Sequence, residues 1–80
     1  MNPGPRRFIA YGFASVHDAL AAESALEAGD VRVTAIPSPR ALGELCGVAI
    51  RIAPEDAEAA KAVLARAGLP PRGSAEIDDI

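Results

Sequence analysis

The sequence is poor in the residues that most often build large cores and metal sites. Its 80 residues include no Trp, one Tyr, two Phe and a single Cys. One cysteine excludes an internal disulfide and any metal site built from cysteines. The scarcity of aromatic residues leaves Ala, Val, Ile and Leu to form the core. We therefore expect one small domain in which helices and sheet approach closely across small side chains.

The sequence also has no excess of positive charge and no long apolar run. Lys+Arg 8 against Asp+Glu 11 gives a net charge of -3, and no basic stripe alternates with aromatic residues, which argues against a nucleic-acid binder. No stretch approaches the roughly 18 uncharged apolar residues of a membrane span. The segment Met1–Phe8 lacks the apolar run of a signal peptide. These absences predict a cytoplasmic protein that binds neither nucleic acid nor membrane.

The hydrophobic pattern divides the chain into a short lead-in and one domain. Residues 1–7 are rich in Pro, Gly and Arg and are predicted to be disordered, so the domain is expected over residues 8–78. The pattern predicts helices from Ser15 to Ala28 and from Pro54 to Ala67, and strands over Phe8–Phe13, Val31–Ile36, Gly47–Ile52 and, weakly, Ser74–Ile77. The order βαββαβ favours an α+β ferredoxin-like split βαβ sandwich, with two helices on one face of an antiparallel sheet.

Glu23 interrupts the apolar face of the first predicted helix. At about 100° per residue, that face also contains Val16, Ala19, Leu20 and Leu26. A carboxylate there needs a partner or a position at the edge of the interface. One interpretation pairs Glu23 with an arginine such as Arg40, or with N–H groups of the long loop that follows the second strand. The other leaves Glu23 as a solvated surface residue.

The segment Pro37–Gly47 is longer than a connection between two paired strands requires. Hairpin loops usually span about two to five residues. This segment carries two prolines, an arginine, two glycines and the only cysteine, Cys46. Long excursions of this kind in a compact domain are typical of binding or reactive loops.

Cys46 is the candidate reactive group because a thiolate is the nucleophilic form of cysteine. Arg40 and the N–H group of Gly47 are the candidate anion-stabilising groups, since Gly47 permits close backbone approach or a positive φ. Pro37 and Pro39 restrict the loop and reduce the entropy lost on ordering it. The alternative interpretation makes Cys46 a small buried hydrophobic residue and Arg40 a solvated surface charge.

From about Phe8 to Pro70, the chain resembles the Se/S carrier protein-like family. The resemblance rests on IPSPRALGELCGVAIRI, in which a Pro-Arg pair precedes a Cys-Gly pair that opens a strand. The helix start S-x-H-D-A at Ser15–Ala19 and the helix entered through APEDAEAA also fit. The resemblance implies a ferredoxin-like α+β domain with Cys46 as the carrier cysteine, followed by Gly47 and preceded by Pro39 and Arg40.

The resemblance implies that Cys46 holds sulfur or selenium as a persulfide or selenosulfide and passes it to a partner protein. Such a carrier requires donor and acceptor proteins but no metal or organic cofactor. No general base is placed near Cys46 in the sequence, so turnover of a small substrate by this chain alone is not expected.

Two other functions compete with the carrier hypothesis. In the first, the domain is a non-catalytic binding or regulatory module that holds a small anion or a protein at the Pro37–Gly47 loop, and Cys46 is structural. In the second, Cys46 forms an intermolecular disulfide in a thiol-redox protein. The weak final strand also leaves an open sheet edge, which would allow two copies to form a homodimer.

Overall fold

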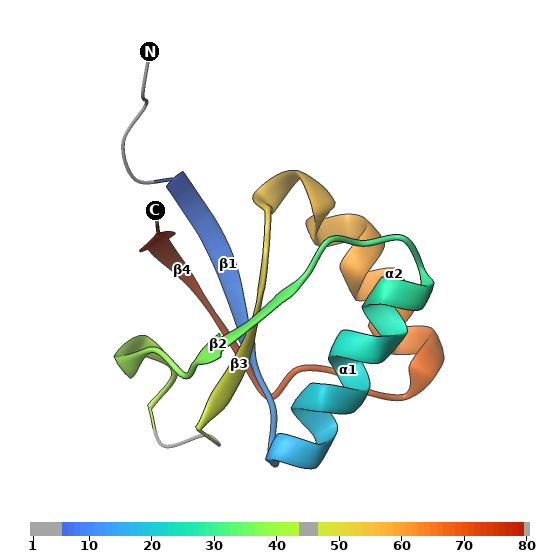
Figure 1. Cartoon of the computed structure of the whole chain (residues 1–80), viewed down its shortest axis with the longest axis horizontal. Coiled ribbons are helices and arrows are strands. Elements are labelled where there is room, and N and C mark those ends of the chain that lie inside the picture. Colours follow the sequence, from blue (N-terminus) through green and yellow to red (C-terminus); the bar gives the residue numbers. More distant parts are fainter. Residues whose placement is uncertain (1–5, 44–46, 80) are drawn as a thin grey trace.

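The computed structural model describes residues 6–43 and 47–79 of the chain. The described elements are β1 (Arg6–Gly12), α1 (Val16–Ala28), β2 (Thr34–Pro37), β3 (Val48–Ile52), α2 (Ala57–Ala67) and β4 (Gly73–Asp79), with single 3₁₀ turns η1 (Arg40–Leu42) and η2 (Pro54–Asp56). The strands form one antiparallel sheet in the order β2-β3-β1-β4. Both helices cover the same face of this sheet (Figure 1), so the predicted ferredoxin-like α+β architecture is confirmed.

Local signals in the sequence define where the helices begin and end. The side chain of Ser15 accepts a hydrogen bond from the Asp18 N–H at 3.1 Å and caps α1. Gly29 is the C-cap of α1, and Gly68 ends α2 in the left-handed conformation at φ 72°. These limits agree with the predicted ones, except that Pro54 begins a 3₁₀ turn and α2 follows from Ala57.

The two strands at the ends of the chain are longer than predicted. β4 runs over Gly73–Asp79 and pairs along its whole length with β1. β1 begins at Arg6, inside the segment expected to be a disordered lead-in. Glycine and acidic residues give β4 low strand propensity, but pairing with β1 overrides it. The Arg7 guanidinium also binds Glu76 at 2.8 Å and Asp78 at 3.1 Å across the two strands.

The second strand is displaced along the chain relative to the prediction. The alternation VRVTAI suggested a strand from Val31, whereas β2 covers only Thr34–Pro37. Val31 instead packs into the core below the end of α1, and its N–H donates to the Leu26 carbonyl at 2.9 Å. This hydrogen bond and the packing of Val31 hold the start of the predicted strand at the end of α1, outside the sheet.

The main core lies between the helices and the sheet and is built largely from small side chains. It contains Tyr11, Phe13, Ala19, Ala22, Leu26, Val31, Ile50, Ile52, Ala60 and Leu64. The alanines of α1 and α2 allow close packing on the strands, as the scarcity of aromatic residues required. The buried face of α1 is rotated from the predicted one, because Val16 and Leu20 are 45% and 48% exposed while Ala22 is buried.

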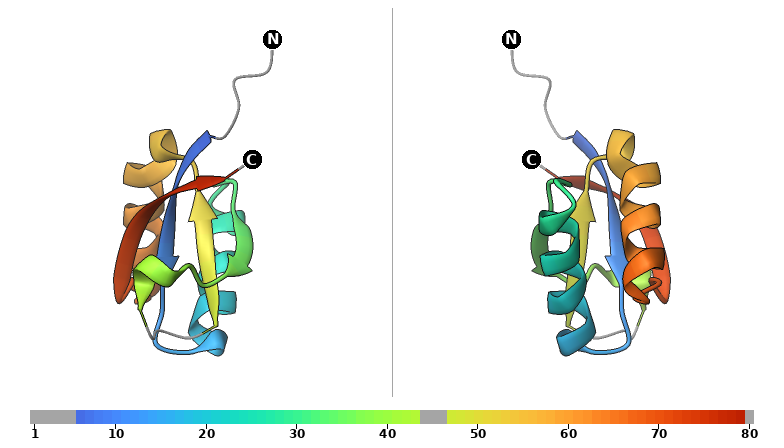
Figure 2. Two further views of the ribbon diagram at one scale, coloured as in Figure 1. Left: turned by 90° about the vertical axis from the view of Figure 1, so that its left-hand side faces the viewer. Right: turned by 90° about the vertical axis from the view of Figure 1, so that its right-hand side faces the viewer.

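A second, smaller core covers the opposite face of the sheet. Ala10 of β1 and Ala49 of β3 are fully buried there, although neither helix lies on that side. The residue that covers them is Leu42 of η1, with Ile36, Ala75 and Ile77 packed around it. The loop between β2 and β3 thus supplies a partial third layer, visible in front of the strands in the left view of Figure 2.

Tyr11 makes the stability of the main core sensitive to high pH. Burial raises the pKa of its phenol, and the negative charge of Glu58 adds to the shift. Above the ordinary tyrosine pKa of about 10, the unfolded chain releases this proton before the folded chain does, so the free energy of unfolding falls as pH rises. We expect wild type to lose stability relative to Tyr11→Phe above about pH 10, measured by urea unfolding. Parallel pH profiles for the two proteins would contradict this.

Candidate functional site

The loop from Pro37 to Val48 is an ordered excursion where the structure describes it. The Ser38 N–H donates to the Gly47 carbonyl at 3.0 Å, which extends the β2–β3 pairing by one step. The chain then turns through η1, where the Leu42 N–H donates to Pro39 and the Gly43 N–H donates to Arg40, both at 3.0 Å. Because η1 packs against β4, the loop crosses the sheet from one edge strand to the other (Figure 2).

Leu42 attaches this loop to the sheet. Its side chain is 9% exposed and packs on Ala10 and Ala49. The two alanines leave a hollow on the sheet surface that a branched side chain fills. The sequence analysis missed Leu42, although a large apolar residue alone in a polar loop, opposite alanine-bearing strands, was a usable signal.

Pro37 and Pro39 hold the two ends of the turn that leads to η1. Pro37 ends β2 opposite Val48, on an edge strand where a missing N–H is tolerated. Pro39 has φ -70° and ψ 155°, and its carbonyl accepts the first hydrogen bond of η1. The loop-shaping role of both prolines stays a prediction.

Cys46 lies outside the described residues. The structure describes only the residues that flank its segment, Gly43 and Gly47. Gly47, which follows it directly, is tied to Ser38 and leads into β3. The positive φ considered for Gly47 is wrong, because the described glycines with positive φ are Gly43 and Gly68. A Cβ at Gly47 would also meet no described heavy atom within 4 Å. Among the described atoms, Gly47 therefore leaves open space beside the start of β3.

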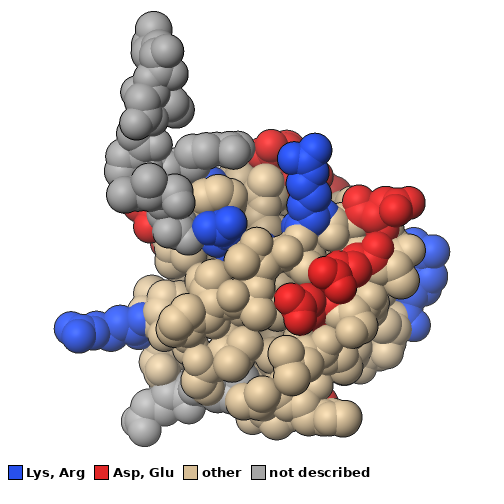
Figure 3. All heavy atoms as spheres, viewed as in Figure 1, with Lys and Arg blue, Asp and Glu red and all other residues tan. Residues whose placement is uncertain are grey.

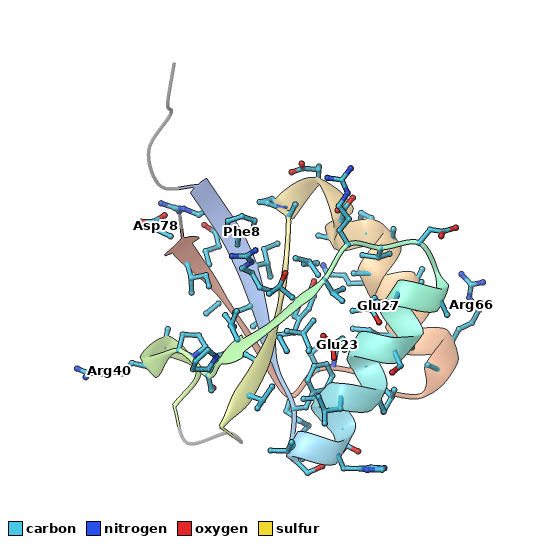
Figure 4. All side chains as sticks on the ribbon, in the orientation of Figure 1. Phe8, Glu23, Glu27, Arg40, Arg66 and Asp78 are labelled. Carbon is cyan, nitrogen blue, oxygen red and sulfur yellow. The ribbon has the colours of Figure 1, made fainter. Side chains whose placement is uncertain are left out.

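Arg40 is exposed and its side chain extends away from the domain (Figure 4). No ion pair joins it to any residue that the structure describes. η1, which carries Arg40, packs against β4 and, through Leu42, on Ala49 of β3. The Arg40 guanidinium faces solvent, and a joint role of Arg40 and the Gly47 N–H in stabilising an anion stays a prediction.

Glu23 is half-buried on α1. Glu23 makes no hydrogen bond or ion pair with a described residue. In Figure 4, the strands of the sheet lie between Glu23 on α1 and the Arg40 side chain. The proposed Glu23–Arg40 pair is therefore absent from the described part of the chain. This outcome follows from the path of the loop, which carries η1 across the sheet face opposite the helices.

Ser38 places an unpartnered hydroxyl beside Gly47. Its Oγ is buried and has no hydrogen-bond partner among the described residues, although a buried hydroxyl usually has one. The sequence analysis did not single out this serine, whose position between two prolines was the available signal. The described residues also contain no group of three or more His, Cys, Asp or Glu side chains placed to hold a metal ion, and no described helix is long and apolar enough to cross a membrane.

The comparisons with known proteins agree with the motif that surrounds this loop. A family model described as Putative Se/S carrier protein-like matches residues 11–76. The chain belongs to this family. No match was found among curated proteins or among solved structures. Membership in the Se/S carrier protein-like family covers the Pro-Arg and Cys-Gly pairs of the loop as well as both helices.

Gly43 is the strained position of the loop between β2 and β3, with φ 70° and ψ -137°. Any residue with a Cβ is disfavoured there even though no described atom lies within 4 Å of the added carbon. We expect Gly43→Ala to lower the free energy of unfolding by about 1–3 kcal/mol, measured by urea unfolding. Gly47→Ala is the matched control and should cost about 1 kcal/mol or less, since Gly47 has no positive φ. Equal losses in the two variants would contradict this assignment.

Proposed function

We propose that this protein carries sulfur or selenium on Cys46 and delivers it to an acceptor protein. Membership in the Se/S carrier protein-like family is the observation that supports this function most strongly. The path of the loop adds to it. The described residues that flank the cysteine segment are held by backbone hydrogen bonds, Gly43 to Arg40 and Gly47 to Ser38.

The proposed transfer is a thiolate exchange that needs no external oxidant. The Cys46 thiolate attacks the outer sulfur of a donor persulfide, R–S–SH, and forms a new S–S bond. The S–S bond in the donor breaks, R–S⁻ leaves, and Cys46 holds the sulfur as Cys–S–SH. Selenium follows the same route from R–S–SeH. The acceptor's thiolate then attacks the outer atom and regenerates the Cys46 thiolate.

The surroundings of the loop fit an exchange between proteins more closely than the binding of a small substrate. Leu42 fixes the turn from below, and Gly47 leaves open space beside the start of β3, so a partner's persulfide could approach. Arg40, an exposed cation on the same loop, is proposed to attract an acidic donor or acceptor. The Gly47 N–H is proposed to stabilise the anionic sulfur.

The most direct test is to load the reduced protein with a cysteine desulfurase and cysteine and to record its intact mass. Because Cys46 is the only cysteine, an adduct on sulfur can form only there. We expect the wild type to gain the mass of one or more sulfur atoms, and a reductant to remove it. Cys46→Ala and Cys46→Ser should gain none.

Two further variants test the role proposed for Arg40 in loading. Arg40→Gln should slow loading by about threefold to tenfold, since loss of one edge charge acts mainly on association rate. Arg66→Gln, which removes an exposed arginine from α2, is the matched control and should load normally. An unloaded wild type, with a thiol that reacts slowly with alkylating probes at neutral pH, would overturn the carrier function and favour the binding module with a structural cysteine.

A further inference from the structure

A second candidate site lies at one end of the sheet, opposite the end where the loop joins β2 to β3. A hollow of about 440 Å³ opens there, within the range of about 300–1,000 Å³ usual for small-molecule sites. Its lining comes from the chain around β2, the first part of β1, and the passage from β3 to η2: Phe8, Asp30, Arg32, Val33, Thr34, Arg51, Ala53, Glu55 and Asp56. The six residue-to-residue steps of extended chain from Gly47 to Ala53, at about 3.3 Å each, place the hollow about 20 Å from Gly47.

One wall of this hollow is preorganised around Arg51. The guanidinium carbon of Arg51 lies 4.2 Å from the centre of the Phe8 ring, a cation–π contact. The Arg51 Nη2 group is also 3.5 Å from the hydroxyl of Thr34. These contacts join β1, β2 and β3, so the aromatic ring and the planar cation form a fixed surface instead of a mobile one.

Three further charged residues around the hollow are not paired with one another. Arg32, Asp30 and Asp56 all line it, yet within the described ranges none of the three forms an ion pair or a side-chain hydrogen bond. Basic and acidic side chains lie together over the end of the molecule where β3 leads to α2 (Figure 3). Charges of both signs are thus held around one hollow and left available.

The balance of these charges indicates the class of ligand. The lining contains two arginines and three carboxylates, so a polyanion such as a nucleotide would meet net repulsion. A bare metal ion is equally unsuited, because no three acidic side chains of the described residues converge to hold one. A zwitterion satisfies both signs at once. Phe8, Val33 and Ala53 provide apolar surface for a side chain.

We propose that this hollow binds a free α-amino acid with an apolar side chain. Arg32 binds the carboxylate, and Asp30 and Asp56 bind the ammonium group. This site does not depend on the function proposed for Cys46.

The test is a titration of the isotope-labelled full chain with L-leucine, followed by amide chemical shifts. We expect saturable shifts at Thr34, Arg51 and Asp56, with no change at Gly43. Isocaproate keeps the carboxylate but lacks the ammonium group, and isoamylamine keeps only the amine. Each should bind about tenfold more weakly than leucine, because each leaves one set of charges unpaired.

Substitutions of the proposed leucine-binding residues test the site without relying on the leucine analogues. Arg32→Gln and Asp56→Asn should each weaken leucine binding about tenfold, while Arg66→Gln, the control on α2, should bind as wild type does. The amide spectrum itself reports whether each variant is folded. The proposal is overturned if no saturable shift occurs at tens of millimolar leucine, if isocaproate binds as tightly as leucine, or if Arg66→Gln weakens binding as much as Arg32→Gln.

Discussion

The packing of Leu42 on Ala10 and Ala49 is the interaction on which the arrangement of this domain depends. Both helices cover one face of the sheet, and residues 6–43 and 47–79 contain no further α-helix for the other face. A four-stranded sheet with an uncovered apolar face would expose its central strands to solvent. The loop between β2 and β3 covers that face with one leucine, and the small side chains of the strands allow it to approach closely. The length of the loop therefore has a structural cause.

The anchoring by Leu42 also fixes the described part of the β2–β3 loop. The chain leaves β2 at Pro37, and η1 then packs against β4 on the sheet face opposite the helices. The Ser38 N–H donates to the carbonyl of Gly47, which leads into β3, so the described start and end of the loop lie side by side. The function proposed for Cys46 requires a thiol that two partner proteins reach in turn, and the anchoring by Leu42 holds the preceding part of the loop on the sheet.

Features that depend on neighbouring residues in the chain were predictable from the sequence. The Ser15 cap, the glycine at the end of each helix and the order of elements are local, and all appear in the structure as expected. The full extent of β4 was not predictable, since its Gly, Glu and Asp residues disfavour a strand until β1 and Arg7 stabilise it. For the same reason the loop's contact with the far face, made by Leu42, escaped detection.

The candidate site was predictable in its residue types but not in its geometry. The Pro-Arg and Cys-Gly pairs identified the loop and the family, and Pro39 stands directly before η1 with φ -70°. Sequence spacing could not show that η1 lies on the sheet face opposite the helices, away from Glu23 on α1. The charged hollow around Arg32 escaped notice because its residues come from three separate segments, none of which has a recognisable motif.

The central claim is that Leu42 holds the loop between β2 and β3 on the sheet. Amide hydrogen exchange in wild type and Leu42→Ala tests this claim most directly. In wild type, the account predicts protection of the Ser38, Leu42 and Gly43 amides, which donate within the loop. In Leu42→Ala, these amides should exchange at least about tenfold faster while those of the β1–β4 pairing stay protected. Loop amides that are unprotected in wild type, or equally protected in both proteins, would contradict the account.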